Sequence, residues 1–448
     1  MSAESDLQPA SGNHLSAPAR RQPWPRKNTP DQIQARQEIL RGLPGWHAEN
    51  DFVFEWPQPP AAYASVLEAL TAHVVLPVSV VGPLPVTMGS YHLDEVSGNV
   101  VEDRRHTEEV YVPLAHSEGG LSASMQRGIA AVIDGGTLET WVLRDRITRD
   151  SCFVFESAAE AIACAAWLAD HAEELRTWLR DPSNPGYAQS FGGVTLLSRH
   201  ARLWEVDTQV LGSACHVLYR FSTGEACGPN MITRNAFALN QWVSERLVSD
   251  TGLRPTRMLV EANMGGDKKP SWQYFLDGGH GKTVFASVRV REQTLRRVLR
   301  TSSEDLVALQ HVASQGGHAS GMQSVAFTPA SAIAAMFATT GQDLGMVGTS
   351  SMAHDVLDRT SDGVHVGMRF PGLEVGTVGG GTGMPHARAY LSLLGCVGPG
   401  SAYRLAQIIA ATALCLELSA SAAASSPGSE HFAMAHLAAS GRSGQAQP

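Results

Sequence analysis

Disulfide and zinc-binding patterns are missing from this sequence. Its six cysteines are scattered and none belongs to a CxxC pair, which argues against structural zinc and fits a reducing cytoplasm. No signal peptide is visible, because the N-terminus has no apolar core. The longest apolar run, residues 408–424, contains Glu417 and several serines, so we expect a buried helix there and not a membrane span. These absences predict a cytoplasmic protein without a bound metal.

Positive charge is also scarce. The 34 Lys and Arg residues are outnumbered by 43 Asp and Glu, which gives a formal net charge of −9. This balance argues against nucleic acid as a partner and against a general attraction to anionic membranes. The chain is long enough for two or three domains with a sizeable core, and its hydrophobic content is ordinary. We therefore expect a soluble globular protein.

Local patterns predict both helices and strands. Residues 1–28 are rich in Ser, Pro, Ala and Arg and are expected to be disordered. Small and apolar residues at helical spacing, with capping residues, predict helices from Thr29 and over 121–133, 157–179, 236–248, 292–308, 330–340, 385–394 and 405–424. Residues 74–86, with their prolines, are expected as extended chain at a sheet edge or on a surface. Further strands are expected over 192–202, 206–221, 254–262 and 283–290.

The segment from about residue 155 differs from what precedes it. A helix, two strands and a second helix follow within about a hundred residues. This order suggests a small α+β insert in a larger α/β protein.

A glycine-dense loop stands near the C-terminal end. Five of the residues from Gly376 to Gly383 are glycines, and residues 385–394 follow as a helix with Pro385 in its first turn. Ordering such a loop costs backbone entropy, which favours a role in close backbone approach to an anion such as phosphate. The spacing matches neither the dinucleotide fingerprint nor the P-loop. Taken alone, the loop is equally compatible with a solvated turn.

Four charged or titratable residues stand out, each with a simpler interpretation. Glu118 precedes a helix and would cap it. Lys268 lies in a charged glycine turn that could simply be solvated. Asp343 follows a helix as a cap or a partner for a lysine. His436 lies near the end of the chain, where a histidine is usually just a surface residue.

The ordered set of segments is more specific than any one of them. The sequence resembles the 3-hydroxy-3-methylglutaryl-CoA (HMG-CoA) reductase family over nearly all of the chain after about residue 30. The matching words occur in the family's order and at about its spacing: PVSVVGPL at 77–84, VPLAHSEGGLSASMQRG at 112–128, EACGPNMIT at 225–233, DKKP at 267–270, GQD at 341–343 and EVGTVGGGT at 374–382.

The resemblance implies a fold and a reaction. It implies an α/β (α+β) large catalytic domain, residues 29–154 plus 258–448, interrupted by a small ferredoxin-like NADP-binding domain, residues 155–257. It implies a homodimer or higher homo-oligomer with active sites at the subunit boundary. It also implies NADPH-dependent, four-electron reduction of an acyl thioester, HMG-CoA to mevalonate in isoprenoid biosynthesis being the family's reaction.

The matching words also assign residues. The resemblance makes Glu118 the catalytic acid, Lys268 the cation that polarises the carbonyl, Asp343 their acidic partner and His436 the group that protonates the departing thiolate. A proton-donating glutamic acid must be neutral, which burial or a neighbouring aspartate would favour. For the cofactor the resemblance implies Ser198 and Arg199 at the extra phosphate of NADPH and the set Asn230, Met231, Gly379, Gly380, Gly381 and Thr382.

The acyl pocket departs from the family. Positions where the family grips the free carboxylate of its substrate align with Val154, Glu261 and Ser331, and residues 313–317 offer no lysine. The loss of two cations and the gain of a carboxylate disfavour a second carboxylate in a dry pocket. The resemblance therefore implies either an HMG-CoA reductase that converts HMG-CoA to mevalonate or a relative with altered acyl specificity, for which we hypothesise an uncharged acyl thioester on CoA or on a carrier protein. The alternative is a catalytically silent homologue that binds a nucleotide or a partner.

Overall fold

The structure is a computed structural model, which describes residues 25–64, 66–191, 193–278 and 280–443. The predicted disordered segment therefore lies almost entirely outside the described residues. The chain divides into two compact units, Met1–Val75 and Leu76–Pro448.

The first unit is organised around helix α1 (Pro30–Arg41), followed by the 3₁₀ turns η1 (Ala48–Phe54) and η2 (Pro60–Ala62). Thr29 occupies the N-cap and Pro30 the first helical position, as predicted. The buried guanidinium of Arg36 links the helix to its surroundings by donating to the carbonyls of Pro25, Lys27 and Leu70 and to the Thr71 hydroxyl. Buried donors that are fully used in this way hold a small core together.

The second unit contains a mixed sheet in the order β10-β11-β9-β3-β1-β2. Its strands are β10 (His354–Arg359), β11 (Gly363–Leu373), β9 (Gly281–Arg291), β3 (Gly136–Val154), β1 (Val78–Leu93) and β2 (Val100–Ala115). Neighbouring strands are antiparallel, except for a parallel contact between Thr87 of β1 and Glu139 of β3. The fold class predicted from the sequence, mixed α and β, is confirmed.

The sequence predicts residues 74–86 as extended chain at a sheet edge or on a surface; the first residues, 74–78, are exposed, but the sheet-edge alternative is wrong. Residues 78–86 belong to β1, which lies between β3 and β2. Its prolines are tolerated because the pairing with β2 shifts register between Val81 and Leu84, and a bulge removes the need for regular ladder donors there.

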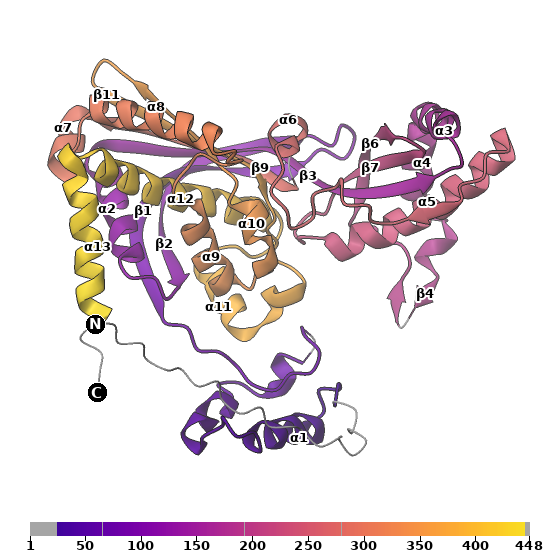
Figure 1. The fold of residues 1–448 in the computed structure, drawn as a ribbon, viewed down its shortest axis with the longest axis horizontal. Coiled ribbons are helices and arrows are strands. Elements are labelled where there is room, and N and C mark those ends of the chain that lie inside the picture. Colours follow the sequence, from indigo (N-terminus) through magenta and orange to yellow (C-terminus); the bar gives the residue numbers. More distant parts are fainter. Residues whose placement is uncertain (1–24, 65, 192, 279, 444–448) are drawn as a thin grey trace, which may run out of the picture. The chain divides into compact units, whose positions relative to one another are not determined.

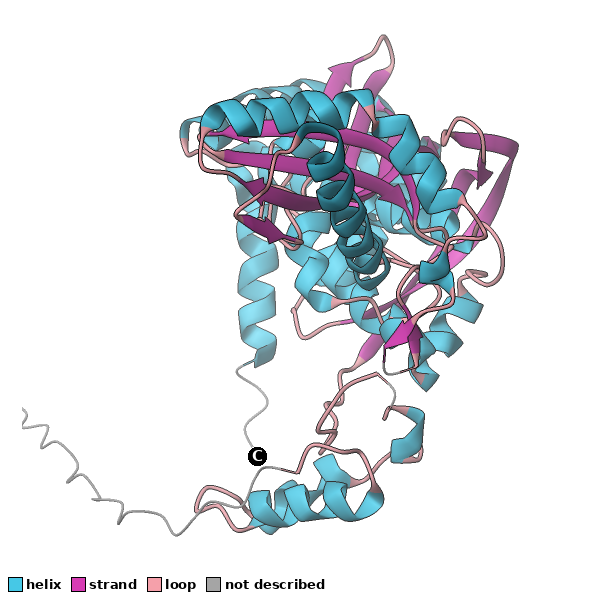
Figure 2. Ribbon diagram, turned by 90° about the vertical axis from the view of Figure 1, so that its right-hand side faces the viewer, coloured by secondary structure: helices cyan, strands magenta, loops and turns pink. Residues whose placement is uncertain are grey.

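Helix α12 (Ser401–Ser425) is the central helix of this unit. It packs against α2 (Leu121–Gly135), α9 (Pro329–Thr340) and α8 (Ser303–Ala319), and against strands of the sheet (Figures 1 and 2). A Cβ on Gly128 of α2 would lie 1.9 Å from the Cys415 carbonyl oxygen, so only glycine permits this contact. Among the described residues α12 is long and apolar enough to cross a membrane, but 83% of its apolar window is buried inside the protein. It is a core helix, as the sequence predicted.

Shorter helices surround this core. They are α6 (Gln273–Asp277), α7 (Glu292–Thr294), α10 (Val347–Ser350), α11 (Pro385–Leu393), α13 (Glu430–Ser443) and the turns η4 (Leu295–Leu299), η5 (Leu344–Met346), η6 (Gly380–Gly383) and η7 (Pro427–Ser429). The single helix predicted over 292–308 is wrong. The chain breaks at Arg300, which has a positive φ of 57°, and restarts at α8, where Ser302 accepts a capping hydrogen bond from the Asp305 amide.

A second apolar core is built by residues between 147 and 260. The far half of β3 pairs there with β7 (Ala214–Ser222) and β8 (Arg257–Leu259), and β7 pairs with β6 (Arg202–Leu211). Helices α3 (Ala158–Asp170), α4 (Ala172–Arg180) and α5 (Pro229–Thr251) complete it. Strand β3 thus belongs to both cores.

Two local predictions in this region fail. The strand expected over 192–202 is reduced to a short pair, β4 (Ser190–Phe191) with β5 (Val194–Thr195), next to the 3₁₀ turn η3 (Pro185–Tyr187). Gly193 takes a positive φ of 84° and turns the chain between them. The helix expected over 157–179 is divided at His171 into α3 and α4.

Candidate active site

Lys268 and Asp343 form an ion pair between two loops. Lys268 lies between β8 and α6 with a positive φ of 58°, and its Nζ is 2.7 Å from Asp343 Oδ2. Asp343 directly follows α9 and also accepts from the Gly345 amide at 2.9 Å. Both side chains remain nearly half exposed. The geometry therefore presents an oriented ammonium group at an open surface.

The pair reinforces its own charged state. The hydrogen bond to Asp343 raises the pKa of Lys268 above its ordinary value. Burial alone would raise the pKa of Asp343, but hydrogen bonds from Lys268 and from the Gly345 amide lower it instead. Both groups are charged at neutral pH, which is the state that can stabilise negative charge on a substrate oxygen.

An arginine behind the pair anchors the lysine loop to β3. The side chain of Arg149 is only 5% exposed and forms ion pairs with Glu261 and with Asp267, the latter at 3.3 Å. Asp267 directly precedes Lys268. The ion pair between Arg149 of β3 and Asp267 therefore attaches the loop to the sheet.

A buried histidine links three strands next to this loop. His280 precedes β9, and its Nδ1 lies 2.8 Å from Oε2 of Glu374, which follows β11. Its Nε2 donates to the Thr148 carbonyl oxygen of β3 at 2.9 Å. Burial would lower the pKa of His280, but the charge and hydrogen bond of Glu374 and the charge of Asp267 raise it above its ordinary value. The three strands are thereby fixed around the site.

Asp267, His280 and Glu374 also place possible metal-ligand atoms within 4.8 Å of one another. Both ring nitrogens of His280 are already engaged by Glu374 and by the Thr148 carbonyl. A metal would have to break one of these buried contacts, so the cluster is better described as an ion-pair network.

Gln342 joins the GQD segment to the glycine loop. Its Nε2 donates to the Gly376 carbonyl oxygen at 2.9 Å, and its Oε1 accepts from the Gly376 amide at 2.9 Å. Because Asp343 follows it directly, one turn of chain holds both Lys268 and the glycine loop. The Lys268–Asp343 ion pair and the predicted cofactor loop are thus linked through hydrogen bonds of Gln342.

The glycine loop runs beside the chain that leads into α5. The Thr377 amide donates to the Glu225 carbonyl at 2.7 Å, and Ala226 and Val378 form a parallel bridge. A Cβ on Gly376 would lie 2.4 Å from the Cys227 amide nitrogen, so the approach requires glycine. Asn230 and Met231 lie in the first turn of α5. Two segments predicted to handle the cofactor are therefore side by side.

Ser198 and Arg199 are tied to the same helix. The Ser198 amide donates to Asn235 Oδ1 at 2.8 Å, one turn into α5, and Ser198 is buried. Arg199 is exposed, with its guanidinium carbon 4.5 Å from the centre of the Tyr187 ring. Among the described residues the Arg199 guanidinium has no carboxylate partner, and it stacks on Tyr187 and donates to the Pro182 carbonyl at 3.5 Å.

Among the described residues, Glu118 makes no hydrogen bond or ion pair with Lys268, and His436 lies on a separate helix. Glu118 is exposed between β2 and α2, and among the described residues no hydrogen bond or ion pair engages its carboxylate. His436 is exposed on α13, which points away from the sheet in Figure 1, and its Nδ1 lies 2.8 Å from the Phe432 carbonyl. Both side chains are exposed in the single chain.

Comparison with known proteins identifies the family. Residues 32–440 match the family model of hydroxymethylglutaryl-coenzyme A reductase. The chain is 32% identical over 363 residues to the 3-hydroxy-3-methylglutaryl-coenzyme A reductase of Aeropyrum pernix, covering 80% of this chain and 78% of that one. The Pyrococcus abyssi protein of the same name is 30% identical over 377 residues, 83% of each chain. The chain belongs to the HMG-CoA reductase family.

A solved structure confirms the fold of this HMG-CoA reductase family member. The class II enzyme of Streptococcus pneumoniae, bound to NADPH in open conformations, superposes with a TM-score of 0.60 at 18% identity, covering 87% of this chain and 96% of that chain. The family-model match over residues 32–440 confirms the sequence-based identification of the family, and the chain is an NADPH-dependent oxidoreductase.

Sequence reasoning missed several residues of this family member's site. Gln342 lies inside the GQD segment and Glu374 inside the EVGTVGGGT segment. The match of these segments to the family could therefore have indicated both residues as part of the site. His280 has no such signal, because its role appears only when β9, β11 and β3 are assembled. The pairing of Arg149 with Glu261 likewise has no local signal, because the two residues are 112 positions apart.

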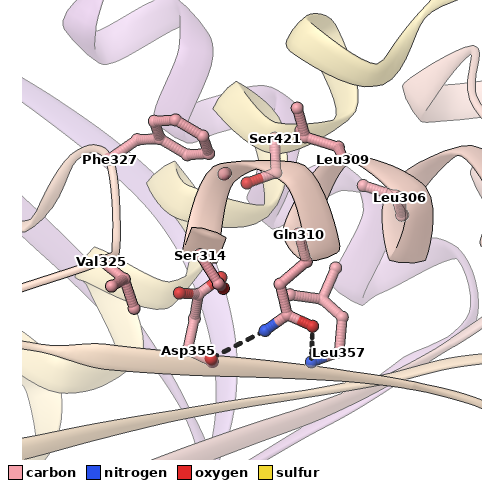
Figure 3. Close-up of a pocket in the computed structure, with 10 residues that line it drawn as sticks. Leu306, Leu309, Gln310, Ser314, Val325, Phe327, Asp355, Leu357 and Ser421 are labelled. Atoms are coloured by element: carbon pink, nitrogen blue, oxygen red, sulfur yellow. Dashed lines mark hydrogen bonds between the residues drawn. The ribbon is translucent and has the colours of Figure 1, made fainter. Parts of the chain in front are cut away.

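One recess lies away from the site. Leu306, Gln310 and Ser314 of α8 face Asp355 and Leu357 of β10 there (Figure 3). Gln310 donates to the Asp355 carbonyl at 2.7 Å and accepts from the Leu357 amide at 2.9 Å. The recess has no room for a water molecule, so it is a packing seam and not a ligand site.

Proposed function

We propose that this protein reduces an acyl thioester to an alcohol in two successive two-electron steps, with release of the thiol. The observation that carries the proposal is the Lys268–Asp343 ion pair held against the glycine loop through Gln342. The family acts on a CoA thioester with NADPH as reductant, and the names of the relatives make HMG-CoA, with mevalonate as product, the first substrate to test.

Lys268 has the central role in the proposed chemistry. NADPH, when bound, supplies the hydrides. As the thioester carbonyl is reduced, negative charge develops on its oxygen, and a fixed ammonium stabilises that charge more in the transition state than in the ground state. Such a contact lowers the activation free energy of the step by about 3–4 kcal/mol. Asp343 orients the ammonium and keeps it charged.

Two further residues complete the proton balance. Collapse of the first tetrahedral species breaks the carbon–sulfur bond and releases a thiolate, which His436 would protonate. Reduction of the resulting aldehyde gives an alkoxide, which Glu118 would protonate. Because no contact joins Glu118 to Lys268 within the described part of one chain, we propose that a second subunit of a homodimer brings these two residues together.

We assign residues 155–257 as the NADP-binding domain. The second apolar core supports this assignment, and so does the N-terminus of α5, which carries Asn230 and Met231 beside the glycine loop. Helix N-termini favour phosphate groups. A Cβ built on Gly379 or Gly380 meets no neighbour within 4 Å, so the loop backbone is open to a ligand. Arg199 is free to grip the 2′-phosphate.

The proposal extends to the cell compartment and the thiol carrier. The scattered cysteines are all unpaired thiols, which supports a cytoplasmic location. The family supports CoA as the thiol carrier.

The test is a stoichiometric assay. NADPH oxidation is followed by absorbance with HMG-CoA and with other acyl-CoA thioesters, and free thiol is titrated in parallel. We expect two NADPH oxidised per thiol released. A ratio of one would identify an aldehyde-releasing enzyme, and no oxidation with any thioester would favour the silent homologue.

A further inference from the structure

His280 is a buried histidine whose two ring nitrogens both face acceptors. Nδ1 lies 2.8 Å from Oε2 of Glu374, and Nε2 lies 2.9 Å from the carbonyl oxygen of Thr148. A carboxylate and a carbonyl only accept hydrogen bonds, so both nitrogens donate and the ring is an imidazolium. His280 and Glu374 are both buried. The ring is therefore a buried cation that cannot turn without losing a hydrogen bond.

Asp267 brings the lysine loop to the same ring. A carboxylate oxygen of Asp267, one of Glu374 and a ring nitrogen of His280 lie within 4.8 Å of one another. Asp267 directly precedes Lys268, whose ammonium forms the ion pair with Asp343. The imidazolium therefore faces the acid that stands next to the proposed catalytic lysine, and its charge attracts that acid.

Glu374 leads directly into the glycine loop. One residue separates it from Gly376, and its amide donates to the buried Ser350 hydroxyl at 3.0 Å. The seam between β9 and β11 is closed beside it, because a Cβ built on Gly372 would lie 2.8 Å from the His280 amide nitrogen. The two strands meet there backbone against backbone. The start of the glycine loop is therefore fixed relative to the His280 ring.

The imidazolium is a second link between the glycine loop and the lysine loop. Gln342 supplies the first, since it binds Gly376 and directly precedes the acid that holds the Lys268 ammonium. His280 acts at a separate point, on the two carboxylates that precede these loops. A single link leaves a hinge, whereas two separate links fix an orientation. A displacement of about 1 Å between reacting groups can lower a rate on the order of 10²-fold.

We propose that His280 is a positioning residue for the reduction: through Glu374 and Asp267 it sets the glycine loop, which we assign to the cofactor, relative to the loop that carries Lys268. Because His280 is fully buried, it acts through these two carboxylates and not by touching the reacting atoms. This inference rests on the proposed thioester reduction and adds to it a residue that aligns the hydride donor with the ammonium.

Kinetic measurements on His280→Gln test the proposal, because glutamine keeps a donor for Glu374 but carries no charge. We expect kcat to fall about tenfold or more, while the Kd of NADPH, measured by fluorescence titration, stays within about threefold of the wild-type value. The isotope effect on kcat with NADPH deuterated at the transferred position should increase, since a misaligned hydride transfer becomes the slower step. His365→Gln is the matched control. It removes a 2.6 Å contact to Ser287 between the same two strands, near the opposite end of β11, and should leave all three quantities near the wild-type values.

Amide hydrogen exchange of the protein without substrate or NADPH gives a readout that needs no activity. In H280Q, exchange should become faster in residues 263–270 and 374–383 together, whereas H365Q should change neither segment. Glu374→Gln, which removes the charge from the other side of the contact, should give the same pattern. The double variant H280Q/E374Q should add little to either single change, because both act through one contact.

Thermal melting shows which variants fold, and E374Q decides if H280Q does not. A folded variant with kcat within about threefold of the wild-type value overturns the proposal, and so does faster exchange in only one of the two segments. An equal loss of kcat in H280Q and H365Q also overturns it, because the effect would then be a general loosening of the sheet. No NADPH oxidation by the wild type with any thioester would contradict the proposed function instead, and the exchange measurement would still decide whether His280 couples the two loops.

Discussion

At the scale of single residues, Lys268 is the group whose removal should matter most. Replacement by glutamine removes the charge while keeping much of the side-chain length. We expect Lys268→Gln to lower kcat/KM by about 10²–10³-fold, since a contact made to developing charge is lost. Lys269→Gln is the matched control, because the only hydrogen bond of the Lys269 ammonium among the described residues is to the Asp267 carbonyl; it should cost less than tenfold. Steady-state kinetics decides, and a K268Q enzyme with more than a tenth of wild-type activity would contradict the assigned role.

Arg199 should set the choice between NADPH and NADH. Its guanidinium is exposed and stacks on Tyr187 without a carboxylate partner among the described residues. A free guanidinium binds a phosphate in two-pronged geometry. Arg199→Gln should reduce the preference for NADPH over NADH by about tenfold or more, mainly through the KM for NADPH. An equal loss of activity with NADPH and with NADH would indicate that Arg199 has a structural role instead.

At the scale of elements, the His280–Glu374 pair ties β9 and β11 to β3. The pKa of His280 is raised in the folded protein, so the imidazole holds its proton more tightly there than in the unfolded chain. The stabilisation is fully present below the ordinary pKa of about 6.5 and is lost as pH rises through the raised folded value. The free energy of unfolding should therefore fall over this pH range.

His280→Gln should remove that pH dependence. It should also lower the free energy of unfolding by about 3–5 kcal/mol below pH 6.5, because Glu374 loses its partner while buried. Urea unfolding of both proteins from pH 5.5 to pH 9 makes the comparison. Parallel curves for the wild type and the variant would show that His280 is not the titrating group.

Helix α12 depends on one buried acid. Glu417 accepts hydrogen bonds from the amides of Phe327 and Thr328 at 2.9 and 2.8 Å and from the Thr328 hydroxyl at 2.6 Å. A glutamine would turn an NH₂ group towards one of these donors. Glu417→Gln should cost about 1–3 kcal/mol of stability, measured by chemical unfolding. Ser421→Ala, which loses only a 3.4 Å contact to Glu417, should cost clearly less, and equal effects would argue against this account.

At the scale of the whole molecule, the proposed dimer predicts complementation. If Glu118 and Lys268 of one site come from different subunits, a dimer of one Glu118→Gln chain and one Lys268→Gln chain has one site intact and one doubly altered. Random pairing should then restore about a quarter of wild-type activity from two inactive proteins. Co-expressed, separately tagged chains allow the mixed dimer to be purified and assayed. An inactive mixed dimer would place both residues in the same subunit.

The parts of the site that the sequence predicted are those carried by contiguous words. DKKP and GQD indicated Lys268 and Asp343, and the structure joins them at 2.7 Å. The roles of Glu118 and His436 stay predictions, because one chain leaves both exposed. The pairing of Arg149 with Glu261 could not be read from the sequence, since the two residues are separated by 112 positions and belong to no common pattern.

The sequence by itself determined the family and those local elements that have clear start signals or apolar periodicity. Proline and glycine punctuation placed the starts of α1 and α11, and apolar periodicity identified α12 as a buried helix, because these signals act over a few residues of chain. Tertiary structure alone decided that β1 lies inside the sheet, that Gln342 couples the acid to the glycine loop and that Arg149 is already neutralised. Each of these depends on partners distant in sequence, whose meeting is set by sheet order and burial and not by local pattern.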